Sequence, residues 1–205
     1  MVLVSVPANL GYMALAALVA GESAGLPIPG ETALVSAALL AGSGQLSLPL
    51  VIGVAAVAAV VGDNLGYWFG RRAGRRALQA RRGPLRRHRQ HLLDRGEAFF
   101  ARHGGKAVVL GRFVAGVRVV TAVVAGASGM PARRFFIANA AGAIGWASLT
   151  ALLVWWLGPL GAVIALTSGW TLAAVGGIAG GVRARRRAST AAPAAVATTR
   201  SPAAT

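Results

Sequence analysis

Long apolar stretches alternate with short polar ones along this chain of 205 residues. Residues 1–21, 32–62 and 135–182 contain no Asp, Glu, Lys or Arg. About 20 apolar residues are enough for a helix to cross the hydrocarbon core of a bilayer. The pattern therefore predicts an all-α integral membrane protein.

The last apolar run divides at Gly158-Pro159, close to its middle. Each half is long enough for one span, so we expect helices near 134–157 and 160–182 with a tight turn between them. The run 32–62 is too long for one helix and too short for two spans. Its turn residues predict a short segment over 30–42 and a full span from about 48 to 70. A short apolar segment bounded by turn residues is typical of a re-entrant helix.

Residues 71–103 form a strongly basic loop, which the positive-inside rule places in the cytoplasm. Within it, Leu92, Leu93, Phe99 and Phe100 recur at a spacing of seven. That spacing predicts an amphipathic helix that lies in the membrane interface.

Residues 107–130 are long enough to span, but Arg112 and Arg118 interrupt them. A full span would put the arginine-rich tail that follows residue 182 outside the cell. A segment that enters and returns leaves Arg133, Arg134 and the tail in the cytoplasm, as the positive-inside rule favours. We therefore expect a second re-entrant segment, opposite in orientation to the first.

The resulting plan is a small helical bundle with two opposed re-entrant helices in an inverted repeat, a transporter design. Residues 1–182 would form one transmembrane domain, with re-entrant segments near 22–45 and 107–130. Residues 183–205 would form a basic and then disordered cytoplasmic tail. The protein would be a multi-pass plasma-membrane protein with its C-terminus in the cytoplasm.

Composition narrows the function classes. Hydrophobic residues make up 56% of the chain, and the net charge is +16. The basic residues flank the apolar runs, which suits an anionic membrane leaflet better than nucleic acid. Cysteine is absent, and the three histidines lie in one polar loop, where we expect solvated side chains and no metal-ligand set. We expect no metal, no cofactor and no catalytic residue.

Five charged residues fall within or beside the apolar segments: Glu22, Glu31, Asp63, Arg112 and Arg118. A charge at the bilayer centre costs about 2.5–3.5 kcal/mol on insertion scales, so such groups usually face a cavity or a partner.

The acids have two interpretations each. Glu22 and Glu31 could lie at the interface, with Glu31 favouring a helix N-terminus, or could line a shared cavity and bind protons because burial favours the neutral form. Asp63 could pair with Arg71 or Arg72, or take part in proton binding.

The arginines also have two interpretations. Arg112 is close to Lys106 and could extend to the interface, whereas Arg118 is further from it. Guanidinium groups bind phosphate at two points, which makes an anion or lipid-phosphate site plausible. We expect the carboxylates to face the arginines, and Arg118 to matter more than Arg112.

Three ordered motifs resemble the DedA family, also known as SNARE-associated or VTT-domain proteins. They are "ESAGLPIPGE" (22–31), "GDNLGYWFGRRAG" (62–74), and "GRFVAGVRVV" (111–120) followed by "AGASGMPARRFFIANAAGAIGW" (125–146). The similarity covers roughly residues 10–180. It implies two opposed re-entrant helices in a small bundle, and a part in lipid translocation or proton-dependent transport.

The resemblance also implies roles for individual residues. The family's functional acids and arginine pair fall on Glu22, Glu31, Arg112 and Arg118, with Asp63 as a further motif acid. Motif positions with a structural role would be Gly25, Pro27, Pro29, Gly30, Gly62, Gly66, Gly116, Gly126, Asn139 and Gly142.

The chain departs from the family pattern at two places. Prolines that the family carries in its third motif are replaced by Ala115 and by Ala122-Val123. Proline removes a backbone donor and breaks helices. We expect Gly116 and Gly126 to permit the turn in their place.

The favoured function is a transporter or flippase of a phosphate-bearing lipid, either undecaprenyl phosphate or a phospholipid, with or without proton coupling. Its partners would be membrane lipids with anionic phosphate head groups. The alternative is a proton-coupled transporter of a small ion with indirect effects on the envelope. An enzyme that acts on lipid phosphates is disfavoured because no membrane-facing histidine accompanies a nucleophile.

Overall fold

The computed structural model describes residues 8–79, 98–100, 102–114 and 117–168. All regular structure in these ranges is helical, with no strand among them, which confirms the all-α class. Two of these helices are long and apolar enough to cross a membrane, over Leu48–Ala73 and Ala132–Leu157. Large apolar side chains such as Val57, Phe69 and Trp156 are exposed on them, as expected for surfaces that face lipid.

Helices α1 (Ala8–Ala24) and α2 (Gly30–Gly42) form a helix–turn–helix pair. Gly25 ends α1 with a φ of 105°, a conformation that side chains with a Cβ rarely adopt. At the start of α2, a Cβ on Gly30 would lie only 2.7 Å from the carbonyl oxygen of Leu18. Glycine at this position therefore lets the two helices approach closely.

Helix α3 (Leu48–Gln79) is longer than the sequence predicts. The span was expected to end near residue 70, with a loop from residue 71, but the helix continues through Gln79. The predicted boundary is wrong because arginine, although polar, is a good helix former and does not end a helix.

The interfacial helix expected around residues 92–100 is only partly covered. Leu92 and Leu93 lie outside the described residues. Phe99 is half exposed, whereas Phe100 is buried in the protein. The two phenylalanines therefore do not share one face.

Residues 105–127 form two short helices, α5 (Gly105–Gly111) and α6 (Val117–Ala127). Helix α7 (Ala132–Leu157) follows. Gly158, with a φ of 54°, then turns the chain into a helix over Pro159–Ser168. The predicted turn at Gly158-Pro159 is thus confirmed, while residues 169–182 of the expected last helix lie outside the described residues.

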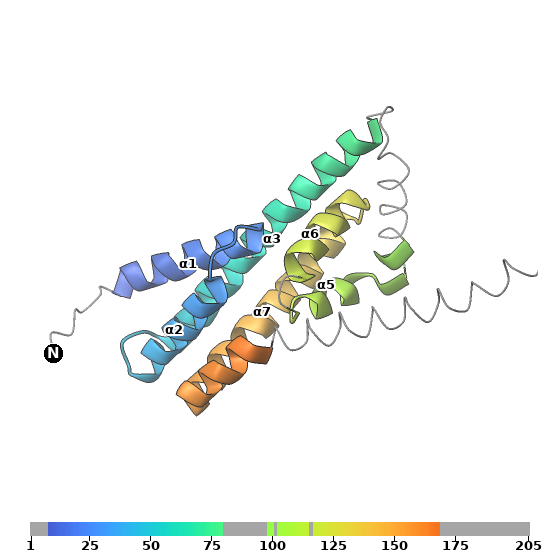
Figure 1. The fold of residues 1–205 in the computed structure, drawn as a ribbon. Coiled ribbons are helices and arrows are strands. Elements are labelled where there is room, and N and C mark those ends of the chain that lie inside the picture. The colour runs from blue at the N-terminus through green and yellow to red at the C-terminus, as the bar shows by residue number, and fades with distance from the viewer. Residues whose placement is uncertain (1–7, 80–97, 101, 115–116, 169–205) are drawn as a thin grey trace, which may run out of the picture.

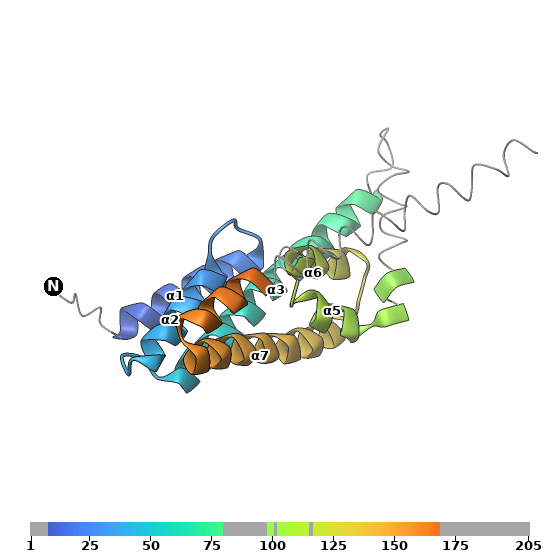
Figure 2. The same cartoon turned by 60° about the horizontal axis from the view of Figure 1, so that its bottom comes forward.

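The long helices α3 and α7 connect the two helix pairs (Figures 1 and 2). Helices α1 and α2 pack toward the first half of α3, and α6 packs along its second half. Close crossings need glycine: a Cβ on Gly62 would lie 2.3 Å from the carbonyl oxygen of Ala20, and one on Gly126 would lie 2.0 Å from that of Tyr67. Gly126 therefore serves helix packing in α6 and not the expected turn; Gly116 lies outside the described residues.

The buried apolar residues form two clusters. One joins α1, α2, α3 and α7 through residues such as Leu34, Val51 and Ala147. The other joins α3, α6 and α7 around Tyr67 and Phe135, whose rings stack with centroids 4.5 Å apart. Along α3 and α7, the polar residues Asp63 and Asn139 lie between the two clusters.

Candidate functional site

The five charged residues come from five separate parts of the fold. Glu22 lies in the last turn of α1, Glu31 at the start of α2 and Asp63 in the middle of α3. Arg112 directly follows α5, and Arg118 lies in the first turn of α6. The folded chain brings four of these groups together in two ion pairs.

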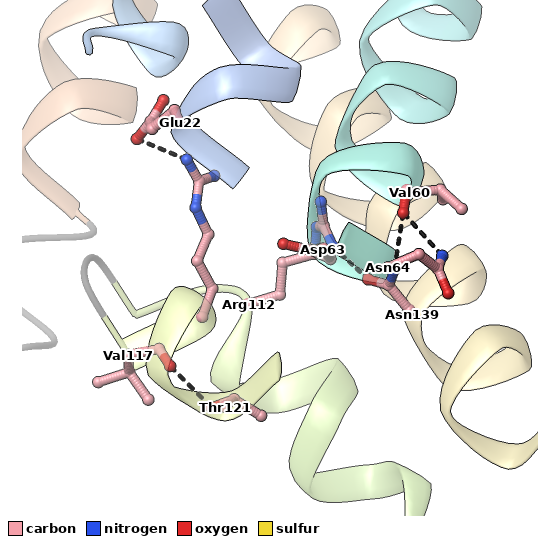
Figure 3. Close-up of polar contacts among 9 residues, drawn as sticks. Glu22, Val60, Asp63, Asn64, Arg112, Val117, Thr121 and Asn139 are labelled. Carbon is pink, nitrogen blue, oxygen red and sulfur yellow. Dashed lines mark hydrogen bonds and ion pairs between the residues drawn. The ribbon is translucent and has the colours of Figure 1, made fainter. Parts of the chain in front are cut away.

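Asp63 and Arg112 form the first pair, and their side chains are only 3–4% exposed. Nη1 of Arg112 contacts the Asp63 carboxylate and also donates to Oδ1 of Asn139 at 2.6 Å. Nδ2 of Asn139 in turn donates to the backbone carbonyl of Val60 at 3.4 Å (Figure 3). The guanidinium is therefore held between α3 and α7.

Glu22 and Arg118 form the second pair, with Oε1 and Nη2 2.5 Å apart. Oε2 of Glu22 accepts a hydrogen bond of 2.7 Å from the backbone N–H of Glu31. The first N–H groups of a helix have no partner within the helix, so this carboxylate satisfies one at the start of α2. Glu22 thus connects the ends of three helices, although its side chain is 24% exposed.

Trp146 of α7 links the two pairs. The guanidinium carbon of Arg112 lies 5.7 Å from the centre of its ring, and that of Arg118 lies 5.2 Å from it. These distances are within the range of cation–π attraction. Sequence reasoning did not select Trp146, although it lies seven residues after Asn139 and so on the same face of α7.

A cavity of about 680 Å³ adjoins the cluster. Its wall includes both glutamates, both arginines and Trp146, and the turn between α1 and α2 completes it. Asp63 does not line this cavity and lies behind Arg112. Glu31 makes no ion pair within the described part of the chain.

Arg112 keeps unused hydrogen-bonding capacity. Its Nε and Nη2 atoms are buried and have no hydrogen-bond partner in the described ranges. Buried donors are nearly always paired in folded proteins. Arg112 also lines the cavity, so its side chain and that of Arg118 belong to the same wall.

Several alternatives from the sequence are wrong. Asp63 does not pair with Arg71, which donates instead to the hydroxyl of Tyr67 and the carbonyl of Met130. Arg112 does not extend to the interface. The exposed fraction is 4% for Arg112 and 8% for Arg118. Burial therefore gives no reason to expect Arg118 to matter more than Arg112.

The replaced family prolines leave α6 intact. Ala122 and Val123 lie within an unbroken helix, and Ala122 is 2% exposed against the second apolar cluster. The α5 helix ends earlier, at Gly111, and α6 begins at Val117. Ala115 lies outside the described residues.

Comparison with known proteins agrees with this description. The sequence model of the VTT domain matches residues 28–156, which include four of the five charged residues and leave out Glu22. The chain belongs to the DedA family of VTT-domain membrane proteins. Protein DedA of Escherichia coli K12 is 33% identical over 124 residues, which cover 60% of this chain and 56% of that protein.

Other relatives of this DedA-family chain cover more of it. An uncharacterized membrane protein of Synechocystis is 40% identical over 83% of this chain and 80% of the relative. One of Mycobacterium tuberculosis H37Rv is 42% identical over 75% of this chain and 72% of the relative. No solved structure matches the chain significantly.

Proposed function

We propose that this DedA-family protein is a transporter that moves a phosphate-bearing lipid, undecaprenyl phosphate or a phospholipid, across the plasma membrane. One observation carries the proposal: two guanidinium groups line the same cavity, and the Nε and Nη2 atoms of one of them, Arg112, have no partner among the described residues. A planar guanidinium binds phosphate at two points, and burial strengthens each charged contact.

The two carboxylates give the transporter a way to release its substrate. Glu22 already occupies Arg118, so a phosphate that enters the cavity competes with it for the guanidinium. A proton on Glu22 would remove this competition, and Glu31, in the same cavity wall, is a second proton acceptor. We therefore propose that lipid movement is coupled to protons at Glu22 and Glu31, with Asp63 keeping Arg112 in place.

The membrane arrangement is part of the proposal. Helices α2, α5 and α6 contain 13, 7 and 11 residues, fewer than the roughly 20 needed to cross a bilayer. We propose that α2 with the turn before it, near 22–45, and the pair α5–α6, near 107–130, are the two opposed re-entrant segments. The basic region 71–103 and the tail 183–205 would then be cytoplasmic, as the positive-inside rule requires.

The topology can be tested by labelling because the chain has no cysteine of its own. Single cysteines replacing Ala80, Ala132 and Ala188 should all react with an impermeant reagent from the cytoplasmic side. Labelling of residue 188 from the side opposite residue 80 would rule out the re-entrant interpretation of 107–130.

The function can be tested with purified protein in liposomes. Labelled undecaprenyl phosphate and labelled phospholipids are assayed with and without a pH gradient. We expect translocation of at least one phosphate lipid, and its loss in Arg118→Gln but not in Arg133→Gln, since Arg133 is exposed at the start of α7. Dissipation of the pH gradient without lipid movement would favour the small-ion transporter instead.

A further inference from the structure

A second cavity of about 340 Å³ lies between α1 and α2, outside the charged cluster. Small residues and leucines from the two helices and the turn after α2 line it, among them Gly11, Ala14, Ala33, Ser36, Leu40 and Leu46. It contains no charged side chain. We refer to it as the α1–α2 groove.

The groove exists because α1 and α2 are tied together at both ends. At one end the backbone N–H of Glu31 donates to Glu22, at 2.7 Å. At the other end the backbone N–H of Ser47 donates to the hydroxyl of Tyr12, at 2.8 Å. Between these ties the small side chains are too short to close the gap.

Gly11 illustrates the difference from the packed glycines of the fold. A Cβ there would meet only Leu46, at the ordinary contact distance of 3.6 Å. At Gly62, by contrast, a Cβ would collide with backbone atoms of α1. Gly11 is therefore not needed for helix contact, and its missing side chain leaves the groove open.

The groove adjoins the charged cavity. Pro29 and Thr32 line both, so the apolar walls of the groove begin beside the site of the arginines. The two cavities together have the polarity of an amphiphile: charged partners at one end and hydrocarbon walls at the other.

We infer that the α1–α2 groove holds the hydrocarbon chain of the same lipid whose phosphate occupies the charged cavity. This inference rests on the proposed function and makes it more specific: the substrate is an amphiphile with a phosphate head and a linear chain. Inorganic phosphate could use only the charged cavity. A neutral lipid could use only the groove, without an anchor at the arginines.

Photolabelling tests this without relying on transport. The full-length protein in nanodiscs is irradiated with a single-chain lysophosphatidate that carries a diazirine in its acyl chain, and the labelled residues are mapped by mass spectrometry. We expect label on groove residues of α1 and α2, removed by excess unlabelled lysophosphatidate. Excess inorganic phosphate should remove much less of it, because it lacks the chain.

Two substitutions on one helix provide the matched control. Ala14 and Ala17 are both exposed on α1, but only Ala14 lines the groove. Ala14→Phe should abolish the competable label by filling the space, whereas Ala17→Phe should leave it unchanged. Ser36→Phe, also exposed and opposite on α2, should act as Ala14→Phe does.

The inference is overturned if a neutral diazirine fatty alcohol labels the groove as strongly, since the groove would then hold bulk lipid. It is also overturned if inorganic phosphate competes as well as lysophosphatidate, or if Ala14→Phe leaves the label unchanged. One further outcome separates the two proposals. If the competable labelling depends on Ala14 but no lipid moves in liposomes, lipid binding in the groove is supported and only the transport function is refuted.

Discussion

The two arginines of the site have different surroundings. Arg112 contacts a carboxylate from α3 and an amide from α7, and both it and Asp63 are almost completely excluded from solvent. Among the described residues, Arg118 is ion-paired only with Glu22, whose side chain remains 24% exposed at the cavity wall. Both guanidinium groups are buried, but the carboxylate partner is enclosed in the first pair and partly exposed in the second.

This difference separates two tasks. A buried ion pair is costly to break because the remaining charge has no counter-ion. The Asp63–Arg112 pair therefore holds the end of α5 against α3 and α7. A partly exposed pair is weaker and can exchange partners with water or a solute. In the proposed transport, Arg118 would be the group that exchanges its anion, while Arg112 would stay fixed beside it.

The largest effect is expected when the enclosed pair is broken. Asp63→Ala leaves a buried guanidinium without its counter-ion and should cost about 3–5 kcal/mol of stability. The measurement is the thermal unfolding midpoint in detergent. Glu22→Ala serves as the matched variant and should lower the midpoint less, since Arg118 lines the cavity, where a solute can replace the carboxylate. Equal losses would show that the two pairs do not differ in role.

The next largest effect is expected when the planar guanidinium group of an arginine is replaced. Arg118→Lys keeps the charge but loses the two-point contact with phosphate. Lipid translocation should fall by about tenfold or more, as expected for the loss of one hydrogen bond to a charged group. Its unfolding midpoint should change little. Arg112→Lys should lower both translocation and the midpoint, because Asn139 also loses its donor. Full translocation by both variants would refute phosphate binding.

A moderate effect is expected on pH dependence. Glu22→Gln keeps the shape of the side chain, removes the charge that competes for Arg118 and cannot take up a proton. Translocation by this variant should respond less to pH than that of the wild type, since glutamine has no carboxylate to take up a proton. Glu31→Gln is assayed in parallel, and an unchanged pH response in both variants would exclude proton coupling at these residues.

The smallest effect concerns the aromatic ring that both arginines share. Trp146→Phe keeps an aromatic face but weakens cation–π attraction, worth about 0.5–1 kcal/mol. Translocation should fall only a few-fold, and stability should change less than in Asp63→Ala. Trp156→Phe is the control because Trp156 is exposed on the same helix. A larger loss in the control would mean that the ring matters for membrane anchoring and not for the arginines.

Much of the fold follows from local sequence. Hydropathy places α3 and α7, and the turn residues locate the break after Glu22 and the one at Gly158-Pro159. The end of α3 was missed because a change from apolar to basic composition marks the edge of a membrane and not the end of a helix. The charged candidates were found because charge is expensive in an apolar segment.

The sequence by itself determined that this is a helical membrane protein of the DedA family with charged residues inside its apolar segments. Only the tertiary structure decided that Asp63 pairs with Arg112, 49 residues away, that Glu22 reaches Arg118, and that Trp146 lies beside both arginines. Helix formation and hydropathy depend on neighbours along the chain, so they can be read from it. The choice of ion-pair partner depends on how closely and at what register helices pack, which here is set by contacts such as Gly62 against α1 and Gly126 against α3.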